Sequence, residues 1–360
     1  MTHESETGLR KLRVAVLMGG SSNERAVSLS TGKMIAESLD TTQYQVTTID
    51  TRDMLALTAS VAAKLPSNAS KKDEKSEGIL TTIDEYSVYS LKSVEKSENA
   101  SPDVVFIALH GKGGEDGTIQ GALELMGIPY TGSGVLASAL AMNKRMAKQL
   151  FRSHGIPVID ELVIQRGRVP SNEKLLEQAI RVFGESALFV KPSSEGSTFG
   201  CSLVLERAEL PKAVEFALQY DEFVLIERYV KGMEITVGVL EDLDEEEGLL
   251  ALPVVEIIPK NAYYDYESKY APDGSKHIIP ARISAAQTAL AQEYAKRCHT
   301  ALGCKGMSRT DLIATDTALY VLEVNTIPGM TPTSLLPQAA EVAGISFPEL
   351  LNRLILSALR

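Results

Sequence analysis

The sequence predicts an α/β protein with more than one domain, and three observations carry this prediction. Two apolar runs, residues 12–18 and 104–109, each end in a glycine-rich polar loop, as buried strands of an open sheet do. Apolar residues recur at near-helical spacing over residues 27–39, so the first strand, its glycine turn and this helix begin a βαβ unit. The chain of 360 residues is too long for one ordinary core and fits two or three domains.

Composition excludes several classes of function. The net charge of -11 argues against binding along a nucleic-acid backbone, which needs clustered Lys and Arg, although a nucleotide needs only a few local cations. The three cysteines, Cys201, Cys298 and Cys304, are too scattered for a disulfide framework or a zinc site and are expected to be reduced and buried. The polar N-terminus does not resemble a signal peptide, and no apolar run reaches the ~20 residues of a membrane helix. We therefore expect a soluble cytoplasmic protein.

The first domain is completed by a second strand at residues 46–49. The Lys/Glu/Ser-rich residues 67–78 are expected to form an exposed loop. The strand at 104–109 leads into a polar glycine-rich loop at residues 110–117. Ligands bind at strand ends in open α/β sheets, so this loop and the glycine turn at residues 19–20 are candidate binding loops. We expect this domain to end near Ser133.

The middle of the chain predicts a helix followed by a hairpin. Residues 142–154 have a helical pattern, which the sequence Gly-Ile-Pro at 155–157 ends. Residues 188–190 and 201–205 are predicted strands. The glycine- and hydroxyl-rich residues 191–200 between them form a hairpin tip that can fold over a ligand.

The last third of the chain contains strands, helices and one long loop. Residues 261–277 include four tyrosines and predict an ordered functional loop, because loops of this length in compact domains are usually functional or disordered. Residues 288–302 predict a helix, and residues 348–359 predict an amphipathic one. The predicted strands are antiparallel ones at 224–229 and 234–240, and a pair flanking a turn at 312–314 and 319–324.

A set of oxygen donors near the C-terminus predicts a metal site. Glu323 and Asn325 lie two apart on one strand, so their side chains face the same way, and Asp311 stands just before the neighbouring apolar run. Carboxylate and amide oxygens suit Mg²⁺ bridging nucleotide phosphates, and one carboxylate can bridge two ions. An ordinary solvated hairpin is the alternative. Arg309 and the Pro-Gly turn at residues 328–329 favour the metal site.

Two lysines are candidate phosphate ligands. Lys144 lies in the predicted helix at 142–154, and Lys191 stands at a strand end before a loop of small residues. An ammonium group suits phosphate oxygens, and backbone N–H groups of such a loop can bind an anion. The sequence contains no P-loop motif, and the glycine turn at residues 19–22 lacks the spacing of a dinucleotide-binding fingerprint.

Seven segments in order closely resemble the D-alanine–D-alanine ligase family of the ATP-grasp superfamily, over residues 12–336. They are GGSSNERAVS from Gly19, HGKGGEDG from His110, the Lys144 helix, KPSSEGSTFG from Lys191, DYESKY from Asp265, SRTD from Ser308 and EVNTIPGMTPTSLLP from Glu323. The resemblance implies an ATP-grasp fold of three domains, at residues 1–132, 133–227 and 228–360, with a lid loop at 261–277. It also implies ATP as co-substrate, two Mg²⁺ ions that Mn²⁺ can replace, and a homodimer.

The same resemblance implies a role for each matched residue. One group binds and activates the first D-alanine and the transferring phosphate: Glu24, Ser28, His110, Ser197, Tyr270, Arg309 and Gly329. Two residues form the pocket for the carboxylate of the second D-alanine: Ser334 and Leu335. The ATP-binding residues are Lys144, Lys191, Glu227, Glu234 and Lys269. The metal ligands are Asp311, Glu323 and Asn325, with Glu323 bridging the two ions.

The implied reaction follows from the chemistry of a carboxylate, which is a poor electrophile until ATP phosphorylates it. The amine of the second D-alanine then attacks the acyl phosphate, and phosphate leaves from a tetrahedral intermediate. A second hypothesis is a ligase of the same family that forms D-alanyl-D-lactate or uses D-serine. Tyr270 favours the dipeptide, since the lactate-forming relatives typically replace it. A third is a non-catalytic nucleotide-binding protein, which predicts losses among five charged or polar site residues that are all present: Lys191, Arg309, Asp311, Glu323 and Asn325.

Overall fold

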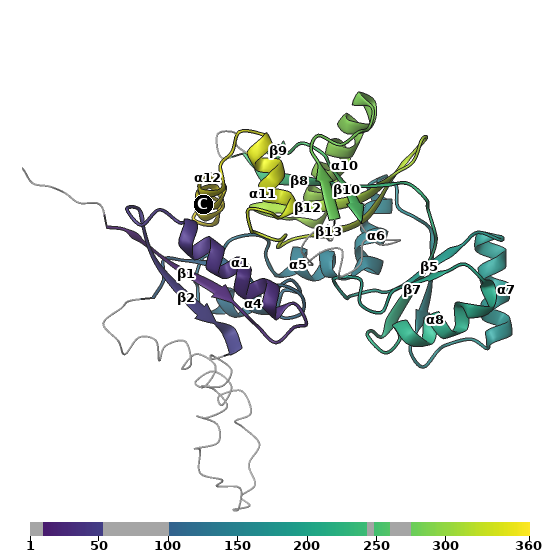
Figure 1. The fold of residues 1–360 in the computed structure, drawn as a ribbon. Coiled ribbons are helices and arrows are strands. Elements are labelled where there is room, and N and C mark those ends of the chain that lie inside the picture. The colour runs from purple at the N-terminus through teal and green to yellow at the C-terminus, as the bar shows by residue number, and fades with distance from the viewer. Residues whose placement is uncertain (1–9, 53–100, 243–247, 260–274) are drawn as a thin grey trace, which may run out of the picture.

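The structure is a computed structural model that describes residues 10–52, 101–242, 248–259 and 275–360. These residues form three sheets with helices packed against them, a mixed α/β architecture that confirms the predicted fold class (Figure 1). Among them, no helix has both the length and the apolar composition needed to span a membrane. The division into domains at residues 132 and 227 stays a prediction.

The N-terminal sheet has the order β2-β1-β3 and is parallel throughout. Its strands are β1 (Leu12–Met18), β2 (Tyr44–Asp50) and β3 (Val104–Ile107), and α1 (Arg25–Ser38) connects the first two. The predicted βαβ unit is therefore confirmed, although β3 ends two residues before the expected boundary. The loop predicted at residues 67–78 lies outside the described residues.

The middle sheet is antiparallel, in the order β4-β7-β5-β6. Pairing of Leu188 with Val204 confirms the predicted hairpin. Buried side chains of α7 (Asn172–Phe183) and α8 (Leu210–Ala217) share one core with this sheet. Its strands are β4 (Glu161–Gln165), β5 (Leu188–Pro192), β6 (Ser202–Val204) and β7 (Phe223–Arg228), and a short 3-10 helix, η2 (Arg207–Glu209), precedes α8.

The C-terminal sheet has the order β11-β10-β8-β12-β13, with β9 paired to β8, and all pairs are antiparallel. Its central hydrophobic core is shared with α5 (Val135–Met142), α6 (Lys144–Ser153) and α10 (Ala285–Leu302). The strands are β8 (Met233–Glu241), β9 (Leu249–Ala251), β10 (Val255–Pro259), β11 (Ser275–Ile278), β12 (Met307–Ala314) and β13 (Leu319–Asn325).

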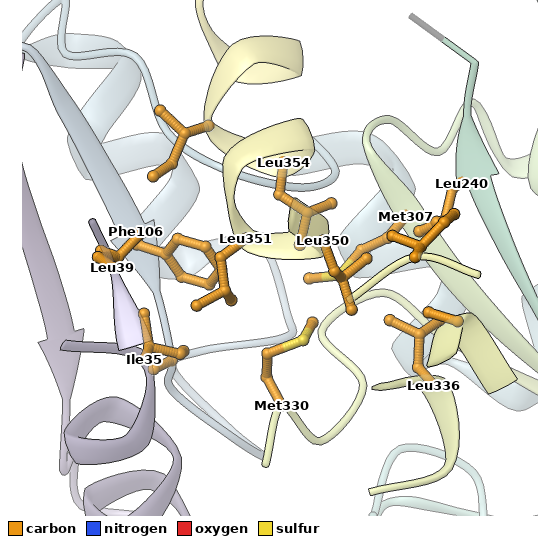
Figure 2. Packing of buried hydrophobic residues seen from close by; sticks show 14 of the residues in the cluster. Ile35, Leu39, Phe106, Leu240, Met307, Met330, Leu336, Leu350, Leu351 and Leu354 are labelled. Carbon is orange, nitrogen blue, oxygen red and sulfur yellow. The ribbon is translucent and has the colours of Figure 1, made fainter. Parts of the chain in front are cut away.

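A second core joins the N-terminal sheet to the C-terminal helices α11 (Leu335–Val342) and α12 (Phe347–Ala358). Figure 2 shows leucines of α12 lying between Phe106 of β3 and Met307 of β12. Phe106 and Leu351 are fully buried, and Met307 is 1% exposed. This packing holds the carboxyl ends of the parallel strands against the C-terminal sheet.

Three predictions about elements need correction. The helix expected from residue 142 begins at Lys144, because Asn143 caps it by accepting a hydrogen bond from the Met146 backbone N–H. The strands expected at 224–229 and 234–240 exist, as β7 and β8, but they lie in different sheets. The end of the long loop expected at 261–277 is strand β11, which pairs with β10, while residues 260–274 lie outside the described residues.

The other predicted elements are confirmed. The helix expected at 288–302 is α10, which begins three residues earlier because Ser284 and Gln287 form a capping box. The amphipathic helix expected at 348–359 is α12. Several elements have no counterpart in the prediction: α4 (Thr118–Leu125), α5, β4, α7, α8, β9, β10 and α11.

Candidate active site

A cavity of about 670 Å³ lies where the ends of the parallel strands meet the C-terminal sheet. Residues from seven separate segments line it, so the fold brings together most of the predicted site. The lining residues with predicted roles are Glu24, His110, Lys144, Ser197, Arg309, Glu323, Asn325, Gly329, Ser334 and Leu335.

One face of the β12–β13 pair carries the predicted metal and phosphate groups. Asp311 lies opposite Glu323, and Arg309 lies opposite Asn325, so the four side chains share one face. A register shift follows, because Leu312 pairs with Val321 and leaves one extra residue in β13. This bulge lets both Val321 and Val324 enter the core, although they are three residues apart.

Asp311 accepts hydrogen bonds from three side chains, those of Arg309, Asn325 and Thr236. It is 7% exposed, and Arg309 donates to both of its oxygens at 3.0 and 2.9 Å. Asn325 Nδ2 donates to Oδ2 at 3.0 Å, and Thr236 Oγ1 donates to Oδ1 at 2.5 Å. Two carboxylates and one amide form the hard oxygen-donor set that Mg²⁺ prefers, so these residues fit the ion. Arg309 pairs with Asp311 and Lys144 pairs with Glu323 on this face.

Lys144 binds the second carboxylate of this set. Its Nζ lies 3.0 Å from Glu323 Oε2 and donates to the Glu195 backbone oxygen at 2.7 Å. Burial alone would lower the pKa of Lys144, but the Glu323 carboxylate outweighs burial, so the pKa is raised. Lys144 therefore remains a cation between the metal face and the hairpin tip.

Glu24 is a buried carboxylate in the lining of the cavity. It is 7% exposed, stands at the N-terminus of α1 and accepts a short hydrogen bond from Ser197 Oγ. Gly111 has a φ of +71°, and a Cβ there would lie 2.7 Å from Glu24 Oε2. The glycines of the predicted binding loop thus allow backbone to approach this buried carboxylate, which suits an ammonium group.

His110 and Glu115 stand beside Glu24. Burial lowers the pKa of His110 despite the opposing effect of Glu24, which favours a neutral ring, and Thr31 Oγ1 lies 3.2 Å from its Nε2. Burial and the charge of Glu24 raise the pKa of Glu115 to about 8, although the Gly111 backbone N–H donates to it at 2.7 Å. The sequence analysis assigned no role to Glu115, although it lies inside the quoted HGKGGEDG motif.

Ser28 does not line the cavity. It is fully buried, donates to the Ala108 backbone oxygen at 2.6 Å and accepts from the Gly19 backbone N–H at 2.8 Å. Its hydroxyl therefore joins the ends of β1 and β3 and holds the glycine turn in place. The structure gives Ser28 this supporting position, and its closeness to the first substrate stays a prediction.

The loop before α11 forms the remaining wall. Ser334 is the N-cap residue of α11, and its Oγ lies 3.1 Å from Thr331 N and 2.8 Å from Thr331 Oγ1. A Cβ at Gly329 would lie 2.9 Å from Ser334 Oγ, so the hydroxyl packs against this glycine. Leu335 is the first residue of α11, and helix N-termini favour carboxylates.

A second, narrower cavity of about 150 Å³ separates the middle and C-terminal sheets. Apolar side chains flank it: Ile159, Phe189, Ile313 and Leu322. The described residues with a predicted ATP role all line it: Lys144, Lys191, Glu227 and Glu234. Lys269 and Tyr270 lie outside the described residues. Cys298 and Cys304 are buried as expected, but Cys201 is only half-buried and lines this cavity.

Glu227 is buried between two lysines. Lys191 Nζ lies 2.8 Å from its Oε2, and Lys148 Nζ makes a short ion pair with its Oε1. Burial alone would raise the pKa of Glu227, but Lys191 and Lys148 outweigh it, so the pKa is lowered. No role for Lys148 was predicted from the sequence. Its one available signal was that it adjoins Ala147 and lies three residues before Phe151, on the apolar side of the helix.

Two antiparallel sheets that enclose a cavity lined by lysines and acids, with a parallel α/β unit beside them, define the ATP-grasp class of fold. Comparison with known proteins supports this. Family models described as the D-ala D-ala ligase N-terminus and C-terminus match residues 13–133 and 150–356. The chain belongs to the D-alanine–D-alanine ligase family.

Similar proteins extend over nearly the whole chain. A D-alanine–D-alanine ligase of Syntrophobacter fumaroxidans is 46% identical over 97% of this chain and 98% of its own. The crystal structure of the Bacillus anthracis ligase complexed with ATP is 29% identical, has a TM-score of 0.72 and covers 97% of this chain and 98% of its own. The VanG D-Ala:D-Ser ligase of Enterococcus faecalis is 31% identical, with a TM-score of 0.72, and covers 97% of this chain and 100% of its own.

Proposed function

We propose that this chain joins two D-alanine molecules into D-alanyl-D-alanine for peptidoglycan precursors, converting ATP to ADP and phosphate. The observation that carries this proposal is that one cavity is lined both by a buried anion suited to an ammonium group and by cations suited to phosphate. Glu24 is the anion, and Arg309 and Lys144 are the cations. Membership in the D-alanine–D-alanine ligase family supports the same reaction.

The first step is phosphorylation of the first D-alanine. Glu24 binds its ammonium group, with Ser197 fixing the carboxylate of Glu24 and His110 lying beside it. Lys144 and Lys191 bind phosphates of ATP, and Glu234 binds the ribose. Glu227, which lines the same narrow cavity, is a further ATP-binding residue. Positioning and charge neutralisation supply most of the catalysis in phosphoryl transfer.

The metal face completes this step. Asp311, Glu323 and Asn325 would hold two Mg²⁺ ions, and Mn²⁺ could take their place. The bound ions would neutralise the charge of the phosphates. Arg309 would then leave Asp311 to the metal and direct its guanidinium to the transferring phosphate. Arg309→Ala is expected to abolish turnover while ATP binding largely survives, and a near-normal rate would refute this role.

The second step joins the two molecules. The carboxylate of the second D-alanine binds at Ser334 and Leu335, at the N-terminus of α11. Its amine attacks the acyl carbon, the backbone N–H of Gly329 donates to the oxyanion, and phosphate leaves as the tetrahedral intermediate collapses. Lys269 at the γ-phosphate and Tyr270 linked to Ser197 remain parts of this proposal, as does the role of their loop in excluding water.

The test is D-alanine-dependent release of phosphate, with the dipeptide identified by mass. The reaction is run with D-alanine alone and with D-alanine in competition with D-lactate or D-serine at neutral pH. The products then distinguish a D-alanyl-D-alanine ligase from a ligase that uses D-lactate or D-serine. The D-Ala:D-Ser ligase among the similar structures makes D-serine the closest alternative to test. A product that contains mainly D-lactate or D-serine would refute D-alanine as the second substrate. ATP hydrolysis whose rate does not depend on D-alanine would favour the alternative of a nucleotide-binding protein that ligates no amino acids.

Assembly and location are also proposals. A homodimer follows from the resemblance, and two-fold dimers are the commonest assembly of soluble proteins. Leu125 at the end of α4 and Leu136 at the start of α5 are 90% and 71% exposed and supply apolar surface for it. Light scattering should give twice the 38.9 kDa chain mass, and a single chain mass would contradict the dimer. Use of ATP supports a cytoplasmic location.

A further inference from the structure

A cluster of five charged side chains lies behind the nucleotide cavity. Lys148 of α6 is 1% exposed, the largest departure in the described chain from the rule that lysines stay in water. Its partners are two glutamates. Lys148 Nζ lies 2.9 Å from Glu161 Oε2 and makes a short ion pair with Glu227 Oε1. Arg152 pairs with Glu161 from the surface side, and Lys191 pairs with Glu227 from the cavity side.

The two lysines on Glu227 differ in what they can reach. Lys191 lines the nucleotide cavity, whereas Lys148 does not and is sealed from it. Each lysine binds a different oxygen of the same carboxylate, Lys191 at Oε2 and Lys148 at Oε1. Lys191 can therefore leave without disturbing the other pair.

A nucleotide phosphate in the cavity would compete with Glu227 for the ammonium group of Lys191, because both partners are anions. A carboxylate that is 3% exposed and loses its last cation is strongly unfavourable, because burial penalises an unpaired charge. With Lys148 in place, Glu227 keeps one cation after Lys191 moves. Arg152 donates to Glu161 Oε1 at 2.8 Å, so the charge of Glu161 is also compensated and does not draw Lys148 away.

We propose that Lys148 is a positioning residue for nucleotide binding, which keeps Glu227 paired so that Lys191 is released to the phosphates. This proposal rests on the proposed use of ATP. It predicts that removing Lys148 locks Lys191 onto Glu227 and weakens nucleotide binding, while the D-alanine sites are unaffected. It also predicts that the effect depends on the charge of Glu227.

The experiment is a double-mutant cycle read by titration calorimetry of the full chain with Mg-ADP and Mg-ATP. Lys148→Met should raise the Kd for nucleotide by 10- to 100-fold and leave the KM for D-alanine within twofold. In a Glu227→Gln background, where a neutral amide no longer retains Lys191, Lys148→Met should change Kd by less than threefold. Lys33→Met is the matched control, since Lys33 on α1 is 72% exposed, and it should bind as the parent does.

Each outcome decides the proposal. An unchanged Kd in Lys148→Met, or an equal loss in both backgrounds, would overturn it, because the loss of nucleotide binding would then not come from Glu227 retaining Lys191. If Lys148→Met fails to fold, Lys148→Gln, which keeps a polar group in the same space, takes its place in the same cycle. A parent chain that binds nucleotide but makes no dipeptide would overturn the proposed ligation and leave this inference to be decided by the binding cycle.

Discussion

Substitution of Gly329 by alanine tests the wall of the second-substrate pocket. The backbone at Gly329 is not left-handed, so alanine introduces no conformational strain there. The added methyl group would instead lie 2.9 Å from Ser334 Oγ and 3.4 Å from Ser334 Cβ. The backbone N–H proposed to bind the oxyanion is retained, so any effect must come through Ser334.

The size of the effect follows from these distances. A carbon and an oxygen in ordinary contact lie roughly 3.4 Å apart, so Ser334 Oγ must move by about 0.5 Å or rotate. Rotation breaks its contacts with Thr331 N and Oγ1, a loss of about 1 kcal/mol for a typical hydrogen bond. A misplacement of 1 Å can cost ~100-fold in rate, so half of it corresponds to about tenfold, or ~1.4 kcal/mol.

Steady-state kinetics with separate KM values for the two D-alanine sites measures this. Gly329→Ala should lower kcat/KM for the second D-alanine about tenfold. The KM values for the first D-alanine and for ATP should stay within twofold of the parent values. Ser334→Ala alone and the double variant complete a cycle. The reasoning predicts that Gly329→Ala adds little once the Ser334 hydroxyl is gone. Full activity of Gly329→Ala, or an undiminished loss in the double variant, would refute it.

Three further predictions follow from the described hydrogen bonds. Ser197→Ala removes the donor to Glu24 and should raise the KM for the first D-alanine by about ten- to hundredfold, as one charged hydrogen bond suggests, with the KM for ATP as the internal control. Ser28→Ala should lower the free energy of unfolding by about 1–3 kcal/mol in urea titrations, since it strands buried backbone groups, while a KM effect without loss of stability would contradict its supporting position. Arg13 hydrogen bonds hold the pKa of Asp103 far below its usual range, so this pair stabilises the fold above about pH 4 and is lost as pH falls through the lowered pKa. Asp103→Asn should therefore lower Tm at pH 7 by more than at pH 3, and a constant difference across that range would count against the pairing.

The sequence predicts elements well where one local pattern dominates. The continuous apolar run of β1 and the glycines that follow it are visible without tertiary contacts. The capping box of α10 is equally local, but it was overlooked, so the predicted helix began three residues late. Short elements such as β9 and α8 were missed because a few residues carry no clear period. The common face of Glu323 and Asn325 was predicted from their spacing, and it is confirmed by their pairing with Asp311 and Arg309.

Contacts between distant segments could not be predicted from local pattern. The bulge in β13 depends on how β13 is paired with β12. The residues of either strand alone do not determine this register. Burial of Lys148 depends on glutamates 13 and 79 positions later in the chain, Glu161 and Glu227, which only the folded sheet places beside it. The position of Ser28 depends on Ala108, whose backbone oxygen it reaches across the parallel sheet.

The central claim is that the first D-alanine is activated as an acyl phosphate, and an isotope experiment tests it most directly. D-alanine labelled with ¹⁸O in both carboxylate oxygens would be converted with unlabelled ATP, and the phosphate and dipeptide would be analysed by mass spectrometry. The mechanism predicts that one ¹⁸O passes from the activated carboxylate to each phosphate released, while the new amide carbonyl keeps the other. Dipeptide formed with entirely unlabelled phosphate would contradict the acyl phosphate and the account of the site built on it.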